Sequence, residues 1–578
     1  MNSTSPSPVR SATPRRWASK AVAVAVGLTM VLTGCTDDPA PTASSPRAPS
    51  AGTASSPPAP SPSPSPTPTP SPSTSLGAFG VNSGHPSATR AGMQILEAGG
   101  NAVDAAIATA FADSVMQPAS SGIGGGGAAL VVADGQARSY DYREVVNAAG
   151  VVPPSGTGIP GFVAGLDELH REYATLPWAA LLQPAIDLAR TGAPVSRYLA
   201  RTINSSLGQR VTGALPQFRN ADGAPLQEGD LLVQQELATT MAALAEQGPR
   251  SFYTGELAQT VVGVEGVDAS SLAAYTVQAS EPPRGRVGDY TMISASPALP
   301  GAAIIQMVQI AEAAGIGRVP AGSAEFVDLQ SRAWQVAERS VQSQFGDPAF
   351  VQVPTEALTD PAANAALARD LPPAVFQETG QSYDGAPNTT HISVVDANGM
   401  AVSMTNTITN YWGSGQYVAG FFLNDQLERF QDIGAQGANN PPLPGRRSVT
   451  WSSPSMLLDD RGRPALVIGT PGGRQIPNTT AQVIMLWALQ RVSLDDAVRT
   501  DRFILADGVL RLESERLRTE MTALGYPVRV HPSDARADWG SIQALQVNWD
   551  ERTVSGVADD RRSAGVETAV EAPRQPAG

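Results

Sequence analysis

The sequence predicts a mixed α and β fold with buried helices, and two observations carry this prediction. Two stretches near residue 100 have the caps and apolar spacing of helices, and residues 389–409 have the central turn and alternation of a β-hairpin. At 578 residues the chain exceeds one average domain, although single α/β units of this size occur. No internal repeat is evident. The length alone therefore does not require several domains.

The first predicted helix begins near Ser87, which has the side chain of an N-cap residue and follows His85-Pro86. Gly99-Gly100 ends it, as glycine commonly ends helices. Apolar residues occur at helical spacing between these ends, namely Met93, Ile95 and Leu96. We expect one apolar face on this helix.

A second helix follows directly, with Asn101 as its N-cap and residues 102–115 as its body. Its apolar side chains lie nearly all round the helix axis, including Val103, Ile107 and Phe111. A helix of this kind is buried on several sides.

A glycine cluster, Gly122 to Gly127, precedes a predicted strand over residues 128–132. A flexible turn is the simple interpretation. No helix follows the glycines, which disfavours a dinucleotide-binding loop. Because glycine allows close approach of two backbones, the cluster indicates tight packing around a site.

The predicted hairpin has an Asn398-Gly399 turn between its two strands. Alternate side chains of a strand share a face, so the second strand carries a row of hydroxyls at Ser403, Thr405, Thr407 and Thr409. Threonine is also a good strand former on an exposed face, and a plain surface strand is the alternative interpretation.

The segment Asn388-Thr389-Thr390-His391 and the Thr-rich strand after it resemble the processing site of the γ-glutamyltransferase (γ-glutamyltranspeptidase) family of N-terminal-nucleophile hydrolases. The resemblance extends over roughly Gly77 to Asp560. It implies an α+β fold, a four-layer αββα sandwich with two antiparallel sheets between helical layers. Both autoprocessing fragments, 77–388 and 389–560, would build it as one catalytic unit.

The resemblance implies that the Thr389 hydroxyl attacks the Asn388 carbonyl and that the chain is cut between these residues. An internal hydroxyl is a poor nucleophile, whereas an N-terminal threonine carries its own base, an α-amino group with a pKa of ~7.7–8.0 in model peptides. The released small fragment would be residues 389–578, which is 190 residues.

The family's functional positions transfer to this sequence residue by residue. The implied catalytic residues are the nucleophile, a hydroxyl that orients it and the oxyanion-hole glycines: Thr389, Thr407, Gly472 and Gly473. The implied substrate-binding residues are Arg143, Gln426, Thr409 and Thr450. In the family the arginine binds the donor α-carboxylate, which suits a planar guanidinium. A surface ion pair with Asp141 or Glu144 is the alternative for Arg143.

The chain departs from the family pattern in two parts of the donor site. Where the family binds the donor ammonium with Asn, Gln and Asp, this chain has Thr409, Gln426 and Arg429. An arginine repels an ammonium, so the adjacent Glu428 would have to replace the missing carboxylate. The usual Ser-Ser pair corresponds to Thr450-Trp451, and tryptophan fills far more volume.

The resemblance implies an enzyme that cleaves γ-glutamyl amides of glutathione-like donors through a γ-glutamyl-Thr389 ester and passes the acyl group to water, an amino acid or a peptide. One alternative keeps the machinery for another acyl group, as a poly-γ-glutamate or N-acyl amidase. A non-catalytic surface-binding lipoprotein is the other. No cofactor is expected. The four histidines, His85, His170, His391 and His531, are scattered and form no metal motif, and His391 is expected to be structural.

The first 35 residues predict a lipoprotein signal peptide. Four basic residues precede an apolar run over 21–32 that is too short to span a bilayer comfortably. Cys35, the only cysteine, ends a lipobox-like Leu-Thr-Gly-Cys. We expect lipidation there and an anchor on the outer face of the bacterial cytoplasmic membrane. Residues 36–76, rich in Pro, Ser and Thr, predict a disordered stalk, and residues 561–578 a flexible tail.

The formal net charge is -14. Residues 1–35 hold four basic residues and no acidic one, so the remainder has 35 basic against 53 acidic residues, a net -18. This balance argues against a nucleic-acid partner, because phosphate binding needs clustered lysine and arginine.

Overall fold

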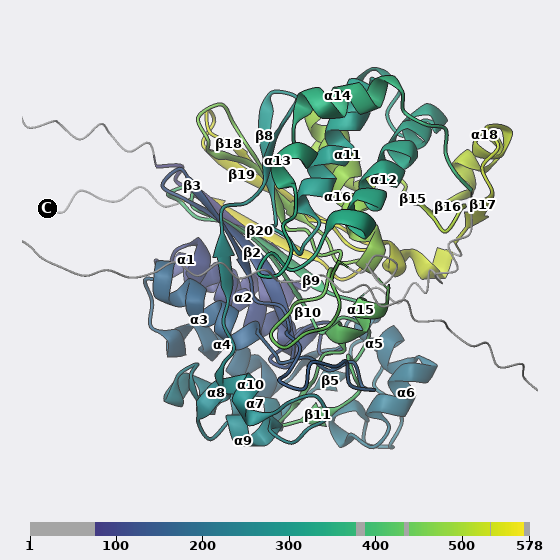
Figure 1. Cartoon of the computed structure of the whole chain (residues 1–578). Coiled ribbons are helices and arrows are strands. Elements are labelled where there is room, and N and C mark those ends of the chain that lie inside the picture. Colours follow the sequence, from purple (N-terminus) through teal and green to yellow (C-terminus); the bar gives the residue numbers. More distant parts are fainter. Residues whose placement is uncertain (1–74, 377–387, 433–438, 532, 571–578) are drawn as a thin grey trace, which may run out of the picture. The chain divides into compact units, whose positions relative to one another are not determined.

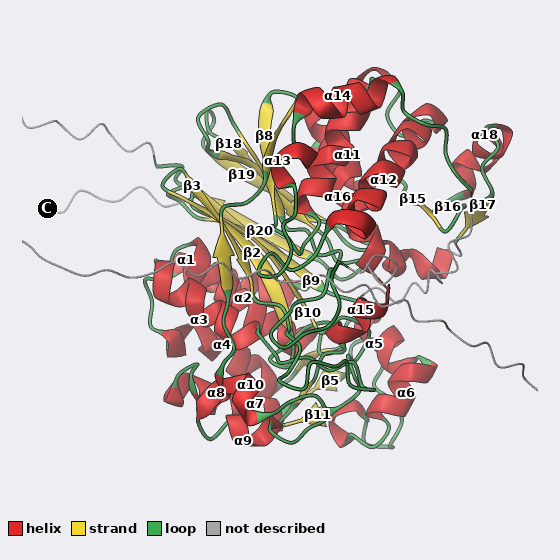
Figure 2. Ribbon diagram, viewed as in Figure 1, coloured by secondary structure: helices red, strands yellow, loops and turns green. Residues whose placement is uncertain are grey.

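Two antiparallel sheets packed face to face form the centre of the computed structural model, and helices cover the outer face of each sheet (Figure 1, Figure 2). The structure describes residues 75–376, 388–432, 439–531 and 533–570, all within one compact unit. The order of helix, sheet, sheet and helix confirms the α+β sandwich that the resemblance implied.

The first sheet has the strand order β20-β1-β9-β10-β2-β3-β6. Its strands are β1 (Ala78–Ser83), β2 (Gly126–Ala133), β3 (Gln136–Asp141), β6 (Gln278–Ser280), β9 (Thr390–Val395), β10 (Ala401–Thr407) and β20 (Gly565–Val570). The helices on its outer side are α1 (Pro86–Glu97), α2 (Ala102–Met116), α3 (Phe162–Tyr173), α4 (Trp178–Thr191), α7 (Gln235–Gln247), α8 (Ser251–Thr254), α9 (Ala258–Val261) and α10 (Ala269–Ala273).

The second sheet has the order β19-β18-β14-β13-β8-β7. Its strands are β7 (Arg284–Val287), β8 (Tyr290–Ser294), β13 (Ser455–Leu458), β14 (Pro464–Gly469), β18 (Gln543–Asn548) and β19 (Thr553–Ala558). The helices on its outer side are α11 (Gly301–Ala313), α12 (Ala324–Gln344), α13 (Thr355–Leu358), α14 (Pro361–Arg369), α16 (Ile476–Ile484, continued as a π-turn over Met485–Leu489) and α17 (Leu494–Arg499).

Smaller elements complete the described chain. Three strands form a separate small sheet, β15 (Phe503–Ala506), β16 (Val509–Leu512) and β17 (Val528–Val530). Two strand pairs are β4 (Ala193–Pro194) with β5 (Leu231–Leu232), and β11 (Tyr417–Val418) with β12 (Phe421–Phe422). The remaining helices are α5 (Arg197–Asn204), α6 (Ser206–Thr212), α15 (Arg429–Asp432) and α18 (Arg518–Ala523).

Three apolar layers hold the sandwich together, and strand β2 shows how. Val131 faces helix α2 in the outer core, whereas Leu130 and Val132 face the second sheet and pack with residues such as Met456. Successive side chains of a strand point to opposite faces, so a central strand here must be apolar or well bonded on both. In the hairpin of β9 and β10 several side chains are polar, and hydrogen bonds of the buried hydroxyls meet this requirement.

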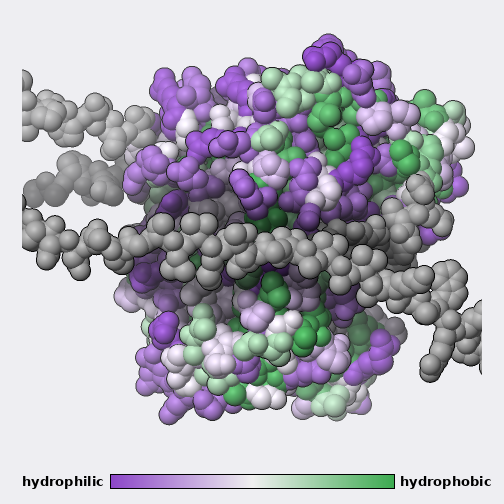
Figure 3. Space-filling model, in the orientation of Figure 1, coloured by the Kyte–Doolittle hydropathy of each residue, from purple (hydrophilic) through white to green (hydrophobic). Residues whose placement is uncertain are grey.

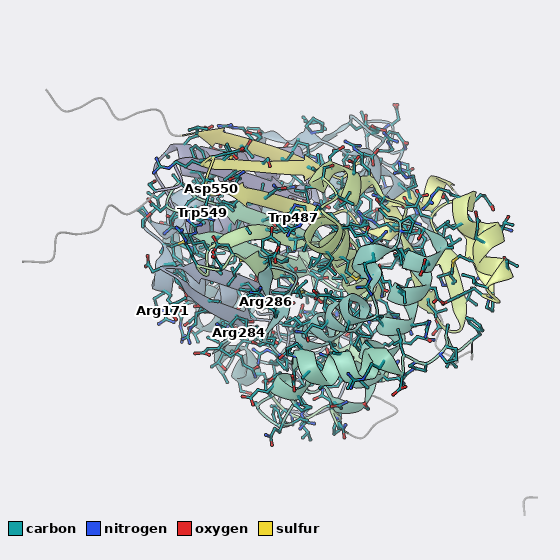
Figure 4. The ribbon with its side chains drawn as sticks, turned by 90° about the horizontal axis from the view of Figure 1, so that it is seen from above. Arg171, Arg284, Arg286, Trp487, Trp549 and Asp550 are labelled. Atoms are coloured by element: carbon teal, nitrogen blue, oxygen red, sulfur yellow. The ribbon has the colours of Figure 1, made fainter. Side chains whose placement is uncertain are left out.

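The exposed edge of the second sheet is protected by charge. Arg284 and Arg286 alternate with buried residues along edge strand β7, and both are labelled in Figure 4. Charged side chains on an edge strand discourage pairing with another chain. On the face shown in Figure 3, hydrophobic residues are scattered among hydrophilic ones.

The predicted helices and hairpin are present, with one change at a cap. Asn101 forms a capping box with Asp104 at the start of α2. Helix α1 begins one residue before Ser87, because Pro86 occupies the first turn and His85 is the cap, accepting a hydrogen bond from the Ser87 N–H. The alternative of an exposed hydroxyl strand is wrong, since every residue of β10 is buried.

The boundaries expected at both ends of the folded unit need correction. Residues 565–570 form β20, which pairs along all of β1, and the preceding Arg561 and Arg562 are buried, so this part is not a flexible tail. The composition of this segment did not predict a strand, because the strand is stabilised by pairing with β1, which lies far away in the sequence. Leu76, expected in the stalk, is buried between the sheets.

Several predictions about the termini fall outside the described residues. The signal peptide, Cys35, the stalk up to residue 74 and the tail from residue 571 are among them, and these stay predictions. Among the residues that the structure describes, no helix is both long and apolar enough to cross a membrane.

A buried charge network fixes the chain just before β20. Arg502 donates to Asp559 at 2.5 Å, and Arg561 contacts Asp559 at 3.3 Å and Glu513 at 2.7 Å. All four side chains are buried. Although burial by itself raises the pKa of Asp559, the two guanidinium groups hold it below its ordinary value.

We expect Asp559→Asn to lower the free energy of unfolding by roughly 3–5 kcal/mol, because it leaves two buried guanidinium groups short of a counter-charge. Urea unfolding followed by circular dichroism would measure it. Asp495→Asn is the control, since its pair with Arg499 is exposed and its loss should leave the midpoint unchanged. Equal midpoints for both variants would contradict a structural role for the network.

Candidate active site

Thr389 lies at the entrance of strand β9, in the middle of the first sheet. Its side chain is buried, with 4% of its surface exposed, and its Oγ1 donates to the Thr407 Oγ1 at 3.2 Å on the neighbouring strand. The Thr407 oxygen also accepts the Thr409 N–H at 2.8 Å. The two hydroxyls that the sequence nominated as nucleophile and orienting group therefore lie in contact.

The peptide before Thr389 is held in an unusual conformation. Thr389 has a φ of 127°, in a region that β-branched residues rarely adopt. On the other side, the amide of the buried Asn388 donates to the carbonyl oxygens of Ala119 and Asn410. The Asn388–Thr389 bond is thus fixed from both ends, with backbone strain on the threonine.

The segment after helix α2 is hydrogen-bonded to residues of both arms of the hairpin. The Ile408 N–H donates to the Ser120 carbonyl at 3.0 Å, and the Thr390 hydroxyl donates to the Ser121 hydroxyl at 3.1 Å. The glycines that follow allow the strands to meet, since a Cβ on Gly125 would lie 2.2 Å from the Thr407 carbonyl oxygen. The prediction of close backbone approach at the glycine cluster is confirmed.

Gly472 and Gly473 form the turn after β14, with φ values of 143° and 55° that favour glycine. Strand β14 of the second sheet packs against β9 of the first at this end, since a Cβ on Gly469 would lie 2.2 Å from the His391 ring. His391 is buried and bonded to the Thr405 hydroxyl at 2.8 Å, and burial lowers its pKa to about 3. Its position against Gly469 agrees with the expected structural role.

Arg562 is a site residue that the sequence analysis missed. Its Nε donates to the Ala537 carbonyl at 2.9 Å and its Nη1 to the Thr389 carbonyl at 3.4 Å. The Gln475 amide, in the glycine turn, donates to the neighbouring Asp538 carbonyl at 3.3 Å. Segment 537–538 therefore connects Thr389, through Arg562, to the glycine turn. No local signal marks Arg562, which the sequence analysis assigned to the tail.

Two of the residues predicted to bind the donor, Thr409 and Gln426, lie in one hydrogen-bonded chain. The Thr409 hydroxyl donates to the Gln426 Oε1 at 2.5 Å, and the Gln426 Nε2 donates to the Ser448 hydroxyl at 2.9 Å. Thr450, two residues further on, is buried, and the ring of the next residue, Trp451, packs 5.6 Å from Trp334 of α12. The tryptophan therefore fills space between the site and a helix.

Arg143 is fully buried and bonded to the protein on three sides. Its guanidinium donates to both carboxylate oxygens of Asp141, at 3.0 and 2.6 Å, and to the Ser448 carbonyl at 2.7 Å. The alternative ion pair with Asp141 is present, but it is buried and not on the surface. Although burial alone raises the pKa of Asp141, Arg143 and Arg447 lower it below its ordinary value.

Asn410, also missed by the sequence analysis, joins three charged side chains. Its Nδ2 donates to Asp425 at 2.7 Å and to Glu428 at 3.1 Å, and its Oδ1 accepts from Arg429 at 2.7 Å. The structure thus brings Glu428 and Arg429 to the same amide. Two carboxylates and one guanidinium share this corner of the site.

Glu144 is fully buried beside this region, and neither of its carboxylate oxygens has a hydrogen-bond partner among the described residues. Burial raises its pKa from 4.5 to about 8. Burial therefore favours the neutral form of the Glu144 side chain near pH 7. Groups of His, Cys, Asp and Glu able to hold a metal ion do not occur in the described part of the chain.

The pH dependence of stability tests the state of Glu144. A raised folded-state pKa gives stability that is complete below about pH 4.5 and lost as the pH rises to about 8. Between pH 5 and 8 the thermal midpoint should therefore fall more in the wild type than in Glu144→Gln. Differential scanning fluorimetry would measure this. Glu97→Gln, which alters a partly exposed ion pair, should keep the wild-type profile; parallel profiles for all three proteins would contradict the assignment.

Comparison with known families agrees with this geometry. The family model described as Gamma-glutamyltranspeptidase matches residues 88–569. The chain belongs to the γ-glutamyltranspeptidase family. The match spans the glycine cluster, both strands of the hairpin and the Gly472-Gly473 turn.

Relatives in this family carry different names. The chain is 31% identical over 492 residues to the capsule biosynthesis protein CapD proenzyme of Bacillus anthracis, covering 84% of this chain and 90% of that one. It is 33% identical over 521 residues to the glutathione hydrolase proenzyme of Pseudomonas aeruginosa (82% and 91%). It is 33% identical over 517 residues to the acylase ACY 1 proenzyme of Pseudomonas sp. strain SE83 (83% and 91%).

The fold also matches solved structures. The crystal structure of cephalosporin acylase from Bacillus halodurans superposes with a TM-score of 0.76 at 22% identity, covering 88% of this chain and 98% of that one. At this identity the match shows the fold alone. Family membership therefore leaves the acyl group that this chain transfers to be argued from its own residues.

Proposed function

We propose that the chain is an autoprocessing γ-glutamyltransferase and hydrolase that uses Thr389 as its nucleophile. The contact between the Thr389 and Thr407 hydroxyls at the head of a buried central strand is the observation that carries this proposal. Burying two hydroxyls costs free energy that a pair of apolar side chains would avoid. Packing of the core alone therefore does not explain the two threonines.

The first step is the cleavage of the chain itself. The Thr389 oxygen attacks the Asn388 carbonyl carbon, the C–N bond between them breaks, and the nitrogen takes the hydroxyl proton, which leaves an ester. Water then hydrolyses the ester and frees the Asn388 carboxylate and the Thr389 hydroxyl and amine. Strain at the Thr389 backbone and the anchored Asn388 amide favour this bond over its neighbours.

The second step acts on substrate. The free Thr389 amine accepts the proton of the Thr389 hydroxyl, whose oxygen attacks the γ-glutamyl amide carbonyl. The backbone N–H groups of Gly472 and Gly473 stabilise the oxyanion, a contribution of ~2.7–4 kcal/mol for one donor in other enzymes. The leaving amine takes the proton, and water or a second amine then releases the acyl group from the ester.

Mass spectrometry of the intact purified protein tests the cleavage. We expect two fragments, the smaller covering residues 389–578, and a single uncut and inactive chain for Thr389→Ala. Thr389→Ser keeps a hydroxyl and should still cut itself, which separates loss of the nucleophile from misfolding. An uncut wild type, or scission in Thr389→Ala, would overturn the proposal.

The donor's ammonium group would bind in the corner formed by Gln426, Asn410 and Glu428. The family has an aspartate where this chain has Arg429, and Glu428 would supply the carboxylate in its place. The two side chains bond to the same Asn410 amide, so the Glu428 carboxylate lies in the same part of the site as Arg429. The carboxylate pair of Asp425 and Glu428 faces one guanidinium, so the corner has acceptors for an ammonium. On this basis we favour a γ-glutamyl donor.

A second candidate function follows from Arg429. If its guanidinium faces the donor, the site favours an acyl group that lacks the ammonium, such as glutaryl, and the chain acts as an N-acyl amidase. The same hydroxyls and glycine turn would carry that reaction. In either case the Arg143 guanidinium is already bonded within the protein, to Asp141 and to the Ser448 carbonyl oxygen.

Two anilides with the same leaving group separate these donors. We expect γ-glutamyl anilide to be turned over faster than glutaryl anilide, and Arg429→Asp to raise the ratio about 10-fold, the effect of one hydrogen bond to a charged group of ~1.5 kcal/mol. Arg171→Asp makes the same charge change on helix α3, which lies well apart from α15 in Figure 1, and should leave the ratio unchanged. A wild-type preference for the glutaryl compound would support the amidase instead.

A further inference from the structure

Arg474 follows the Gly472-Gly473 turn directly and is bound by two carboxylates. Its Nε and Nη2 donate to the Glu338 Oε1 at 2.8 and 2.6 Å, and its Nη1 donates to the Asp507 Oδ1 at 2.9 Å. The side chains of Arg474, Glu338 and Asp507 are only 14%, 12% and 10% exposed. This is a nearly buried, charge-assisted contact and not a solvated surface pair.

Both carboxylates come from well-fixed elements. Glu338 lies in the long helix α12, which also contacts α16 through a hydrogen bond from the Gln330 amide to the Asn478 carbonyl. Asp507 occupies the tight turn between β15 and β16, at a φ of 53°. A guanidinium between two such partners has little freedom, because its planar fork is bonded at both ends.

The two glycines of the turn have no side chains that could hold their backbone N–H groups in one orientation. Glycine has no side chain to pack, and both residues adopt positive φ values that leave the backbone permissive. On its other side, the Ser541 N–H bonds to the Thr470 hydroxyl at 3.1 Å. Arg474 therefore makes charge-assisted bonds directly after the Gly472 and Gly473 N–H groups in the chain. The orientation of these N–H groups decides whether they can bind the oxyanion.

We infer that Arg474 is a positioning residue that orients the Gly472-Gly473 N–H groups, and that Glu338 and Asp507 hold it in place. The inference rests on the proposed function, in which these N–H groups receive the oxyanion. Glu338 precedes the proposed cleavage site and Arg474 follows it, 136 positions away. The ion pair therefore also links the two fragments at the point where the charge of the transition state develops.

The variants that test this change one partner at a time. Arg474→Met removes the charge, Arg474→Lys keeps it without the fork, and Glu338→Gln changes only one functional group. Arg463→Met is the matched control, since Arg463 also binds a carboxylate, Asp459, and stacks on a tryptophan, but lies in the β13–β14 turn. All are measured on the processed two-fragment protein after confirming its mass.

We expect Arg474→Met to lower kcat about 10- to 100-fold with KM changed less than about 3-fold, because a misplaced oxyanion donor weakens the transition state and not substrate binding. Glu338→Gln should fall between this variant and the wild type, Arg474→Lys should recover part of the rate, and Arg463→Met should match the wild type. An unchanged kcat in both Arg474→Met and Glu338→Gln, an effect confined to KM, or an equal loss in Arg463→Met would overturn the inference.

The measurements must report on Arg474 whichever acyl group the enzyme prefers. Both anilides are assayed, since an oxyanion turn serves any acyl group, and labelling of Thr389 by phenylmethylsulfonyl fluoride is followed by intact mass. A wild type that prefers the glutaryl anilide would refute the γ-glutamyl donor, while the rate ratios among the variants would still decide the role of Arg474. A wild type that neither turns over an anilide nor becomes labelled would overturn both proposals.

Discussion

The structure depends on the burial of strand β9 on both of its faces. It lies between β1 and β10 in the first sheet, with helix α2 on one side and the second sheet on the other. Every polar side chain on it must therefore find a partner within the protein. His391 and Ser393 do so with groups of neighbouring strands, and Thr389, at the strand's start, does so with Thr407. Because the whole strand is fixed, Thr389, the proposed nucleophile, is fixed with it.

Charge is used differently in two parts of the molecule. Around Asp559 and Glu513, buried carboxylates and guanidinium groups compensate one another and secure the last strand onto β1. Around Asn410, two carboxylates and one guanidinium meet at a neutral amide that bonds to all three. The first arrangement is closed by internal pairing, whereas the second places unequal charge next to residues of the proposed donor site. Such a corner is suited to recognising a charged group on a substrate.

Much of the site was predictable because its signals are local. The hairpin, the glycine cluster and the two capped helices depend on residues within a few positions of one another, and all are present in the structure. The sequence also identified Arg429 as a departure from the family pattern. It did not indicate Asn410 as the partner of that arginine, since an asparagine in a loop has no distinctive spacing. Nor did it find Arg562, whose role depends on contacts with a segment far from it in the chain.

The amino-acid sequence by itself determined the first two helices, the hairpin with its hydroxyls and the resemblance to the family, because these follow from periodicity, turn residues and short motifs. Only the tertiary structure decided which charges meet. Arg143 is turned to Asp141 inside the protein, Arg474 reaches Glu338 across 136 positions, and residues 565–570 become a strand by pairing with β1. The physical reason is that the partner and the burial of a charged group are set by packing between distant segments, which no local pattern records.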